Sequence, residues 1–288
     1  TIPPHVFLEF GAVGLFGIQV PERDGGLGLT HLECVRIYQQ LAALDLTLAT
    51  QVSSHANCVH LVDRFSSAPA RARWIGPLAT GRVLGAFALT EPEGGSNPHE
   101  IRCEASALDD GRWRLRGEKY LVDTAAWAGV IAVFARTLQA GTDTGSMSGF
   151  LVPRQLAGVK VGAESLTMGL RGMVQNSLAL ENVELPADAL LGTAGTGYAM
   201  VQATLSIARL NLAAKCVGAS KRCLQLADRF ARRRSISNGP MRENSVVRTR
   251  LAELIALVIA TDRLVRTLAR SLDHRIEVEC GRHGITPL

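Results

Sequence analysis

Hydrophobic and polar positions in the first eighty residues repeat with helical spacing. Thr30 and Glu33 form a capping-box pattern. Apolar residues follow them at helical intervals: Leu32, Val35, Ile37, Leu41 and Leu44. A second helix is expected over about 46–65. A third is expected between Pro69 and Gly81, because proline favours the first helical turn and glycine often follows the last. This part of the chain is therefore predicted to be all-helical.

The pattern changes to strand character at Val83. The segment "VLGAFALT" is strand-like, and "RWRLRGEKYLV" alternates apolar and polar residues through Trp113, Leu115 and, after a break at Gly117, Tyr120. "GVIAVFART" is almost continuously apolar, which is typical of a strand buried on both faces. Further short strands follow, each bounded by Gly, Pro or Asn. About one hundred residues without a helical period indicate a barrel or sandwich.

Helical spacing returns at Gly197. One long helix is expected from Tyr198 to about Arg233, and a second over 243–272. Two such helices bury little core alone, so we expect either further helices or another subunit to complete a bundle. The predicted fold is therefore α+β and multidomain. It has an N-terminal helical domain over 1–82, a β-barrel-like middle domain over 83–192, and the first part of a long-helix bundle over 193–288. Both ends look cut, so we expect a fragment.

Composition narrows the function classes. The 288 residues are 47% hydrophobic and 20% charged with a net charge of +5, which is ordinary for a globular protein. Aromatic residues make up only 5% and are not interleaved with basic ones, so nucleic acid is not an expected partner. Neither a signal peptide nor an apolar run of membrane-spanning length is present, so we predict a cytoplasmic protein without a membrane span.

Cysteine and histidine spacing argues against a metal site. The six cysteines include no C-x-x-C pair, and the seven histidines show no metal-ligand spacing. Cys216 and Cys223 lie seven positions apart on one expected helix and share a face. We interpret the cysteines as small core residues rather than metal ligands or disulfide partners.

The stretch "LTEPEGGSN" at 89–97 is the strongest chemical signal. Glycine, proline, asparagine and serine are turn residues, so the stretch alone fits an ordinary turn. It fits equally a backbone that closely approaches a phosphate or a flat ring, because Gly94 and Gly95 have no side chain and Ser96 supplies a hydroxyl.

Several motifs, in order, resemble the acyl-CoA dehydrogenase family of flavoproteins. "ALTEPEGGSN" resembles its flavin loop, and "GEKYLVDTA" resembles the strand that leads to the flavin ring. "GFLVP", "MGLRG" and "LENVELP" resemble the end of its β-domain, and "ARLNLAAKCVGAS" the start of its third domain. The resemblance spans roughly residues 15 to 275.

The resemblance implies FAD as cofactor and places its contacts. Thr90 would bond the ring through its hydroxyl, and backbone near Leu89 would meet the ring's pyrimidine edge. Ser96 would reach the pyrophosphate or the acyl thioester. Asn97 replaces the usual Asp and is expected to cap the loop. At the N5 edge we expect backbone contact, since an ionised Asp123 would repel a reduced flavin. The implied cofactor-binding residues are Phe87, Leu89, Thr90, Gly95, Ser96, Leu121, Asp123 and Arg234.

Two arginines of the long helices also match family positions. Arg234 matches an arginine that reaches the adenine-side phosphates across a subunit interface, although "ARRRSIS" also fits a solvated basic patch. Arg209 matches an arginine near the catalytic end of the acyl pocket. An ordinary surface arginine is the alternative, but its apolar flanks favour a buried, partnered side chain. Ser96 and Arg209 are the expected substrate contacts.

The reaction that the resemblance implies is α,β-dehydrogenation of an acyl thioester, carried by CoA or by acyl carrier protein. Electrons would pass to a flavoprotein or to oxygen, and the protein would be a homodimer or homotetramer. The glutamate that serves as the catalytic base in the family is expected beyond Leu288. In some relatives it precedes the matched arginine, where this chain has Ala208. A flavin oxidase or monooxygenase of the same fold and an inactive structural relative are the alternatives.

Overall fold

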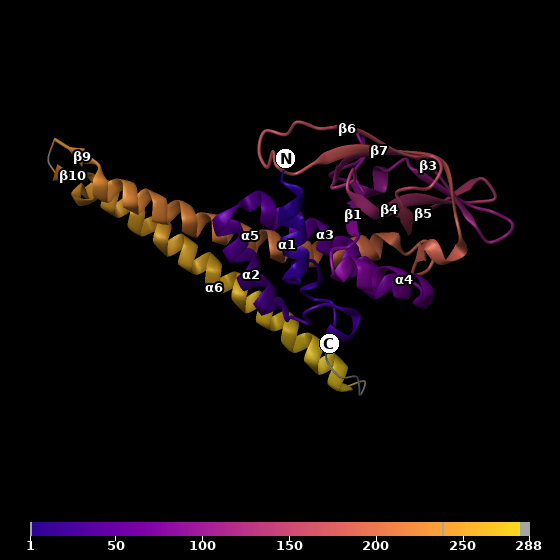
Figure 1. Ribbon diagram of the computed structural model, residues 1–288, viewed down its shortest axis with the longest axis horizontal. Coiled ribbons are helices and arrows are strands. Elements are labelled where there is room, and N and C mark those ends of the chain that lie inside the picture. The colour runs from indigo at the N-terminus through magenta and orange to yellow at the C-terminus, as the bar shows by residue number, and fades with distance from the viewer. Residues whose placement is uncertain (1, 238, 283–288) are drawn as a thin grey trace. The chain divides into compact units, whose positions relative to one another are not determined.

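The computed structural model describes residues 2–237 and 239–282 (Figure 1). Its helices are α1 Pro4–Ala12, α2 His31–Leu44, α3 Leu46–Phe65, α4 Ala68–Ala79, α5 Gly197–Arg233 and α6 Ser245–Arg282. The strands of the main sheet are β1 Leu84–Ala88, β2 Glu104–Ala107, β3 Trp113–Asp123, β4 Ala128–Gln139, β5 Thr142–Pro153, β6 Val159–Glu164, β7 Gln175–Leu185 and β8 Leu190–Leu191. β9 Ser235–Ile236 and β10 Gly239–Pro240 pair between the two long helices. The predicted order of helices, β-domain and long helices is confirmed.

The chain forms two compact units. The first contains residues 1–28 and 51–208, and the second contains residues 29–50 and 209–288. The first unit therefore includes the sheet with α1, α4 and most of α3, and the second includes α2, α6 and most of α5. The domain boundaries expected after residues 82 and 192 stay a prediction.

The predicted helix ends are present. The Thr30 hydroxyl accepts a hydrogen bond from the Glu33 amide, and the Glu33 carboxylate accepts one from the Thr30 amide at 2.9 Å. Pro69 lies in the first turn of α4, whose N-cap is Ser67. Gly81 follows α4 with a φ of +70°, a conformation that favours glycine. Local sequence therefore determines where these helices begin and end.

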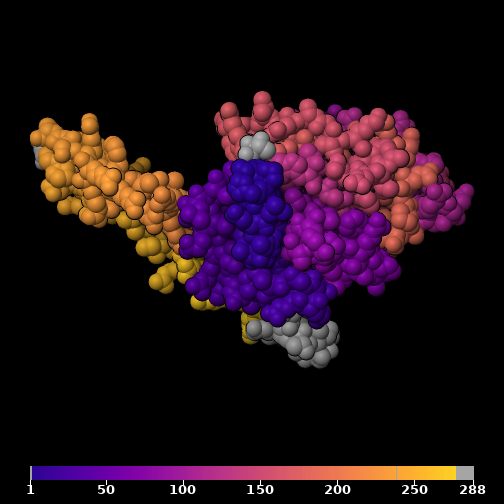
Figure 2. Space-filling model, viewed as in Figure 1, coloured from indigo at the N-terminus to yellow at the C-terminus, as the bar shows by residue number. Residues whose placement is uncertain are grey.

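β4 is the centre of the first unit. The strands run in the order β6-β7-β3-β2-β4-β5-β8, and β1 also pairs with β4. Val130, Ala132 and Phe134 join a core with residues of α3 and α4, whereas the alternate side chains of β4 join a second core with β3 and β7. Figure 2 shows α4, in purple, packed directly against the magenta strand residues. A strand covered on both faces explains the continuous apolar run.

β3 departs from the predicted alternation. Trp113 and Leu115 are buried as expected, but Tyr120 is 40% exposed and Lys119 is buried instead. The buried positions keep their alternate spacing from Trp113 through Leu115 to Lys119. The pairing with β7 then shifts register between Lys119 and Val122, and Val122 is the next buried residue. The alternation expected to resume at Tyr120 after a break at Gly117 instead continues through Gly117 to Lys119.

The buried-cysteine interpretation holds for only part of the chain. Cys34, Cys58 and Cys103 are buried, but Cys216 and Cys223 are exposed. The covered face of α5 carries Gly218 instead, where a side chain would collide with the Gln39 carbonyl of α2. The core assignment of Cys216 and Cys223 was therefore wrong. The side chain of Cys280 lies outside the described residues.

Candidate cofactor site

The loop Leu89–Ser96 leaves the end of β1 in a tight turn. The Glu91 amide donates to the Gly94 carbonyl at 3.0 Å, and the Gly94 amide donates back to the Glu91 carbonyl at 3.2 Å. A Cβ on Gly94 would lie 3.2 Å from the backbone of Glu100 and Ile101. A side chain at Gly94 would therefore press on the backbone of Glu100 and Ile101.

A buried ion pair holds this loop to β3. The Lys119 ammonium lies 2.6 Å from the Glu91 carboxylate, with side-chain exposures of 0% and 3%. Lys119 also donates to the Leu89 carbonyl at 3.1 Å. Glu91 accepts two backbone hydrogen bonds, from the amides of Arg102 and Cys103. Every charge is thus satisfied, as burial requires.

The loop and β3 are also joined through their backbones. The Tyr120 amide donates to the Thr90 carbonyl at 2.8 Å. The sequence predicted Leu89, Thr90 and Leu121 as cofactor contacts. The bonds from Lys119 and Tyr120 hold the loop that carries Leu89 and Thr90 against the strand that carries Leu121. The sequence prediction missed Glu91 and Lys119, although a lysine and a glutamate inside two matched motifs were a usable signal.

The last residues of β3 adopt an unusual backbone. Leu121 and Thr124 have φ angles of 52° and 60°, in the left-handed region that non-glycine residues rarely occupy. Between them, the Asp123 carboxylate accepts hydrogen bonds from the Ser54 hydroxyl at 2.6 Å and the Gln175 amide at 2.5 Å. The Thr124 hydroxyl is buried without a partner among the described residues.

The predicted apolar contacts differ in their exposure. Phe87 packs on Phe134 with ring centroids 5.4 Å apart, and Leu89 is buried in the same core. Their side chains therefore stabilise the first unit. Leu121 is 40% exposed and is available to a flat ring.

The polar end of the loop is open. Gly95 and Ser96 are exposed, and Thr90 is half-buried. A Cβ on Gly95 would meet only the Thr90 methyl, at 3.4 Å, which is ordinary contact. Asn97 accepts a hydrogen bond from the His99 amide and donates one to Glu100, which confirms its capping role.

The two predicted arginines belong to the second unit. Arg209 lies on α5 and is exposed, and no hydrogen bond or ion pair holds it within the part of the chain that the structure describes. The expectation of a buried, partnered Arg209 was therefore wrong: α5 turns Leu210 into the core and Arg209 outward. Arg234 follows α5 and is exposed. Both remain proposed contacts.

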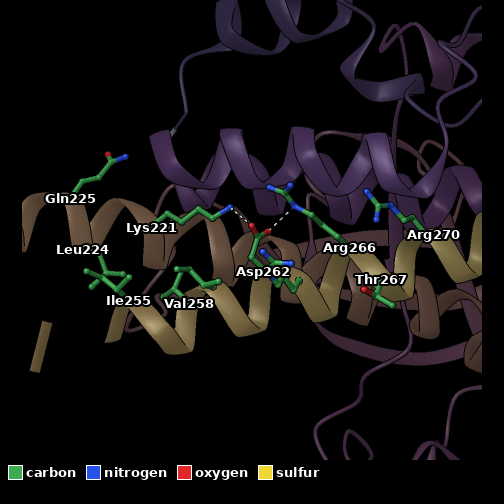
Figure 3. Close-up of a pocket in the computed structure, with 11 residues that line it drawn as sticks. Lys221, Leu224, Gln225, Ile255, Val258, Asp262, Arg266, Thr267 and Arg270 are labelled. Carbon is green, nitrogen blue, oxygen red and sulfur yellow. Dashed lines mark hydrogen bonds and ion pairs between the residues drawn. The ribbon is translucent and has the colours of Figure 1, made fainter. Parts of the chain in front are cut away.

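The second unit has a pocket of its own, between α5 and α6 (Figure 3). Asp262 accepts hydrogen bonds there from Lys221 at 2.9 Å, Arg266 at 3.0 Å and Gln39 at 2.7 Å. Burial opposes ionisation of Asp262, but the hydrogen bonds from Lys221 and Gln39 outweigh it and lower its pKa. No residue predicted from the sequence as a site residue lines this pocket.

Other titratable groups of the first unit are structural. Burial lowers the pKa of His55 to about 4, and its neutral ring accepts from the Gly85 amide and donates to the Leu78 carbonyl. Burial raises the pKa of Cys103 to about 11, so its thiol is a poor nucleophile.

Among the described residues, no group of three or more His, Cys, Asp or Glu side chains could hold a metal ion. Of the helices in those ranges, none combines the length and apolarity needed to cross a bilayer.

Family models match almost the whole chain in one order. Residues 1–82 match the acyl-CoA dehydrogenase N-terminal domain, residues 86–183 the middle domain, and residues 195–282 the C-terminal domain. The chain belongs to the acyl-CoA dehydrogenase family. The resemblance inferred from the motifs is thereby confirmed.

Individual relatives agree. The chain is 30% identical to the human mitochondrial short-chain specific acyl-CoA dehydrogenase over 266 residues, which cover 92% of this chain and 64% of that protein. It superposes on butyryl-CoA dehydrogenase from Megasphaera elsdenii with a TM-score of 0.90 at 24% identity, covering 94% of this chain and 72% of that one. It also superposes on an acyl-CoA dehydrogenase from Bacillus anthracis, solved in complex with FAD, with a TM-score of 0.89 at 28% identity, covering 95% of this chain and 46% of that one. This chain thus spans less than two thirds of the human relative.

Proposed function

We propose that the chain binds FAD and forms the flavin-binding part of an acyl-CoA dehydrogenase. The observation that carries the proposal is the joining of two matched motifs: the Lys119–Glu91 ion pair and the Tyr120–Thr90 hydrogen bond fix the loop Leu89–Ser96 against the end of β3. The Bacillus anthracis relative, solved with FAD, supports the cofactor.

The residues present fit a flavin. Leu121 offers an exposed apolar surface, and the open end of the loop offers the Thr90 and Ser96 hydroxyls. The Leu89 and Thr90 carbonyls are engaged by Lys119 and Tyr120, so the Thr90 hydroxyl and backbone N–H groups are left as ring contacts. N–H and O–H donors suit a ring that gains negative charge on reduction.

We further propose that the substrate is an acyl-CoA thioester. Bound FAD would supply the hydride acceptor for the α,β-dehydrogenation of such a thioester. Ser96 and Arg209 would bind the substrate, and Arg234 would bind the phosphates of FAD. The names of the human and Megasphaera relatives favour a short acyl chain on CoA over a carrier-bound acyl group.

Glu91 of the loop and Asp123 at the end of β3 are both engaged and do not supply the base that removes the α-proton. Glu91 is paired with Lys119, and Asp123 is held by Ser54 and Gln175, so neither is a free proton acceptor. Ala208 has no ionisable group. We therefore propose that a glutamate outside this sequence supplies the base, and that these 288 residues alone bind FAD without turning over thioesters.

The proposal also covers the oligomeric state, the electron acceptor and the cellular compartment. Large apolar side chains of α6 are exposed, including Leu257 at 63% and Leu264 at 59%. Such surface favours a homodimer or homotetramer. An electron-transferring flavoprotein is the proposed acceptor, with oxygen as the alternative. Free buried thiols at Cys34, Cys58 and Cys103 suit a reducing, cytoplasmic compartment.

Titration with FAD tests the proposal. Thr90→Ala and Ser96→Ala should each weaken FAD binding, because each removes a hydroxyl at the open end of the loop. Ser271→Ala is the matched control, since its hydroxyl donates to the Thr267 carbonyl of its own helix. A wild-type chain that fails to bind FAD would refute the proposed cofactor. Equal affinity in all four proteins would refute the assigned contacts.

A further inference from the structure

The end of β3 combines a strained backbone with a buried polar cross-link. Leu121 and Thr124 both have positive φ angles, and the register against β7 shifts between Lys119 and Val122. A non-glycine residue in this region is strained, so the surroundings must hold it there. Strain of this kind is concentrated at functional sites.

Asp123 is the residue through which the surroundings act. One carboxylate oxygen accepts from Ser54 of α3 at 2.6 Å, and the other accepts from Gln175 of β7 at 2.5 Å. Asp123 and Gln175 are also directly paired across the two strands, and the Thr124 amide donates to the Val174 carbonyl at 2.7 Å. A helix and a neighbouring strand thus hold one carboxylate from two directions.

The two hydrogen bonds from Ser54 and Gln175 also restrict the orientation of the Asp123 carboxylate. Hydrogen bonds to a charged group are among the stronger ones in proteins, and two donors share the negative charge of Asp123. A carboxylate held in this way is not free to turn toward a ligand beside β3. The same bonds hold the bulge that exposes Leu121, and the bulge is bonded to the flavin loop through Tyr120 and Thr90.

We propose that Ser54 and Gln175 are positioning residues for the flavin. Acting through Asp123, they fix the Leu121–Thr124 bulge so that its backbone and the Leu121 side chain meet the ring, and they keep the carboxylate from facing it. This proposal rests on the proposed function. It adds Ser54 of α3 and Gln175 of β7, which both lie outside the matched flavin motifs.

The test measures FAD affinity by fluorescence titration, together with the midpoint potential of the bound flavin. Ser54→Ala and Gln175→Leu should each weaken binding about five- to tenfold, since each removes a hydrogen bond to a charged group and only part of that loss reaches the ligand. The potential should fall in both variants, because the freed carboxylate disfavours the reduced anion. Ser54→Thr should restore both values. Ser66→Ala is the control, because its hydroxyl donates to the Val62 carbonyl four residues earlier in the chain.

A double-mutant cycle tests whether the residues act through Asp123. In an Asp123→Ala background, Ser54→Ala should change FAD affinity by less than twofold. Amide exchange of residues 120–126 should rise in the Ser54 and Gln175 variants even without FAD. Unchanged affinity, potential and exchange would overturn this proposal while leaving FAD binding intact. A wild-type chain that binds no FAD would overturn the proposed function and the positioning role together.

Discussion

Breaking the Lys119–Glu91 ion pair should destabilise the first unit and displace the loop Leu89–Ser96. Lys119→Met keeps most of the apolar volume but leaves the Glu91 carboxylate, whose side chain is 3% exposed, without its cation. Removing one partner of a buried pair costs about 3–5 kcal/mol. Two backbone amides still donate to Glu91, so we expect the lower end of that range, about 3 kcal/mol.

Urea unfolding followed by circular dichroism measures this loss. Glu91→Gln combined with Lys119→Met removes both charges and keeps an acceptor for the backbone amides, so the double variant should regain part of the stability. FAD affinity should fall in Lys119→Met, because the Leu89 carbonyl also loses its bond to Lys119. Lys160→Met is the matched control: Lys160 forms an equally short pair with Glu181, but both side chains are more than half exposed.

Burial is the difference between the two lysines: the Lys119 side chain is 0% exposed and the Lys160 side chain 64%. If Lys119→Met and Lys160→Met lowered the free energy of unfolding equally, the surroundings of Lys119 would have to be far more polar than the structure shows. If Lys119→Met lowered stability without lowering FAD affinity, the ion pair would not be needed for the loop's proposed role in FAD binding.

Further predictions concern other residues. The pKa of His55 is near 4 when folded against an ordinary value of 6.5, so only the unfolded chain takes up its proton between those values. Stability should therefore fall by up to about 3 kcal/mol as pH drops from 6.5 to 4, and the unfolding free energy of His55→Gln should vary less with pH. Gly94→Ala should lower the melting temperature and weaken FAD binding, because its Cβ would press on backbone at 3.2 Å. Ala208→Glu should give these 288 residues measurable acyl-CoA turnover with an artificial acceptor, whereas wild type should give none. Sedimentation at micromolar concentration should show a dimer or tetramer, which Leu257→Glu weakens; a monomeric wild type would contradict this.

Local signals made much of the fold predictable. The Thr30–Glu33 capping box, the proline and glycine around α4, and the apolar run of β4 each depend on nearby residues, and each appears as expected. Cys216 and Cys223 could not be placed in the same way, because which face of α5 is covered depends on where α2 packs.

The site was only partly predictable for the same reason. The loop Leu89–Ser96 and β3 were found by their motifs. Whether Gly117 breaks the alternation depends on how β3 pairs with β7, a strand more than fifty residues away, and in the structure the alternation continues to the buried Lys119. Ser54 and Gln175 have no local signal at all, since their shared partner Asp123 is remote from both in sequence. Arg209 was misjudged because apolar neighbours along a helix do not lie on the same face.

The absorbance spectrum of the purified chain, taken after incubation with FAD and removal of free cofactor, shows whether these 288 residues hold the flavin. We expect bound oxidised flavin in a ratio approaching one per chain, and a clear loss of it in Thr90→Ala and Lys119→Met but not in Ser271→Ala. A folded chain that retains no flavin would refute the proposed cofactor site.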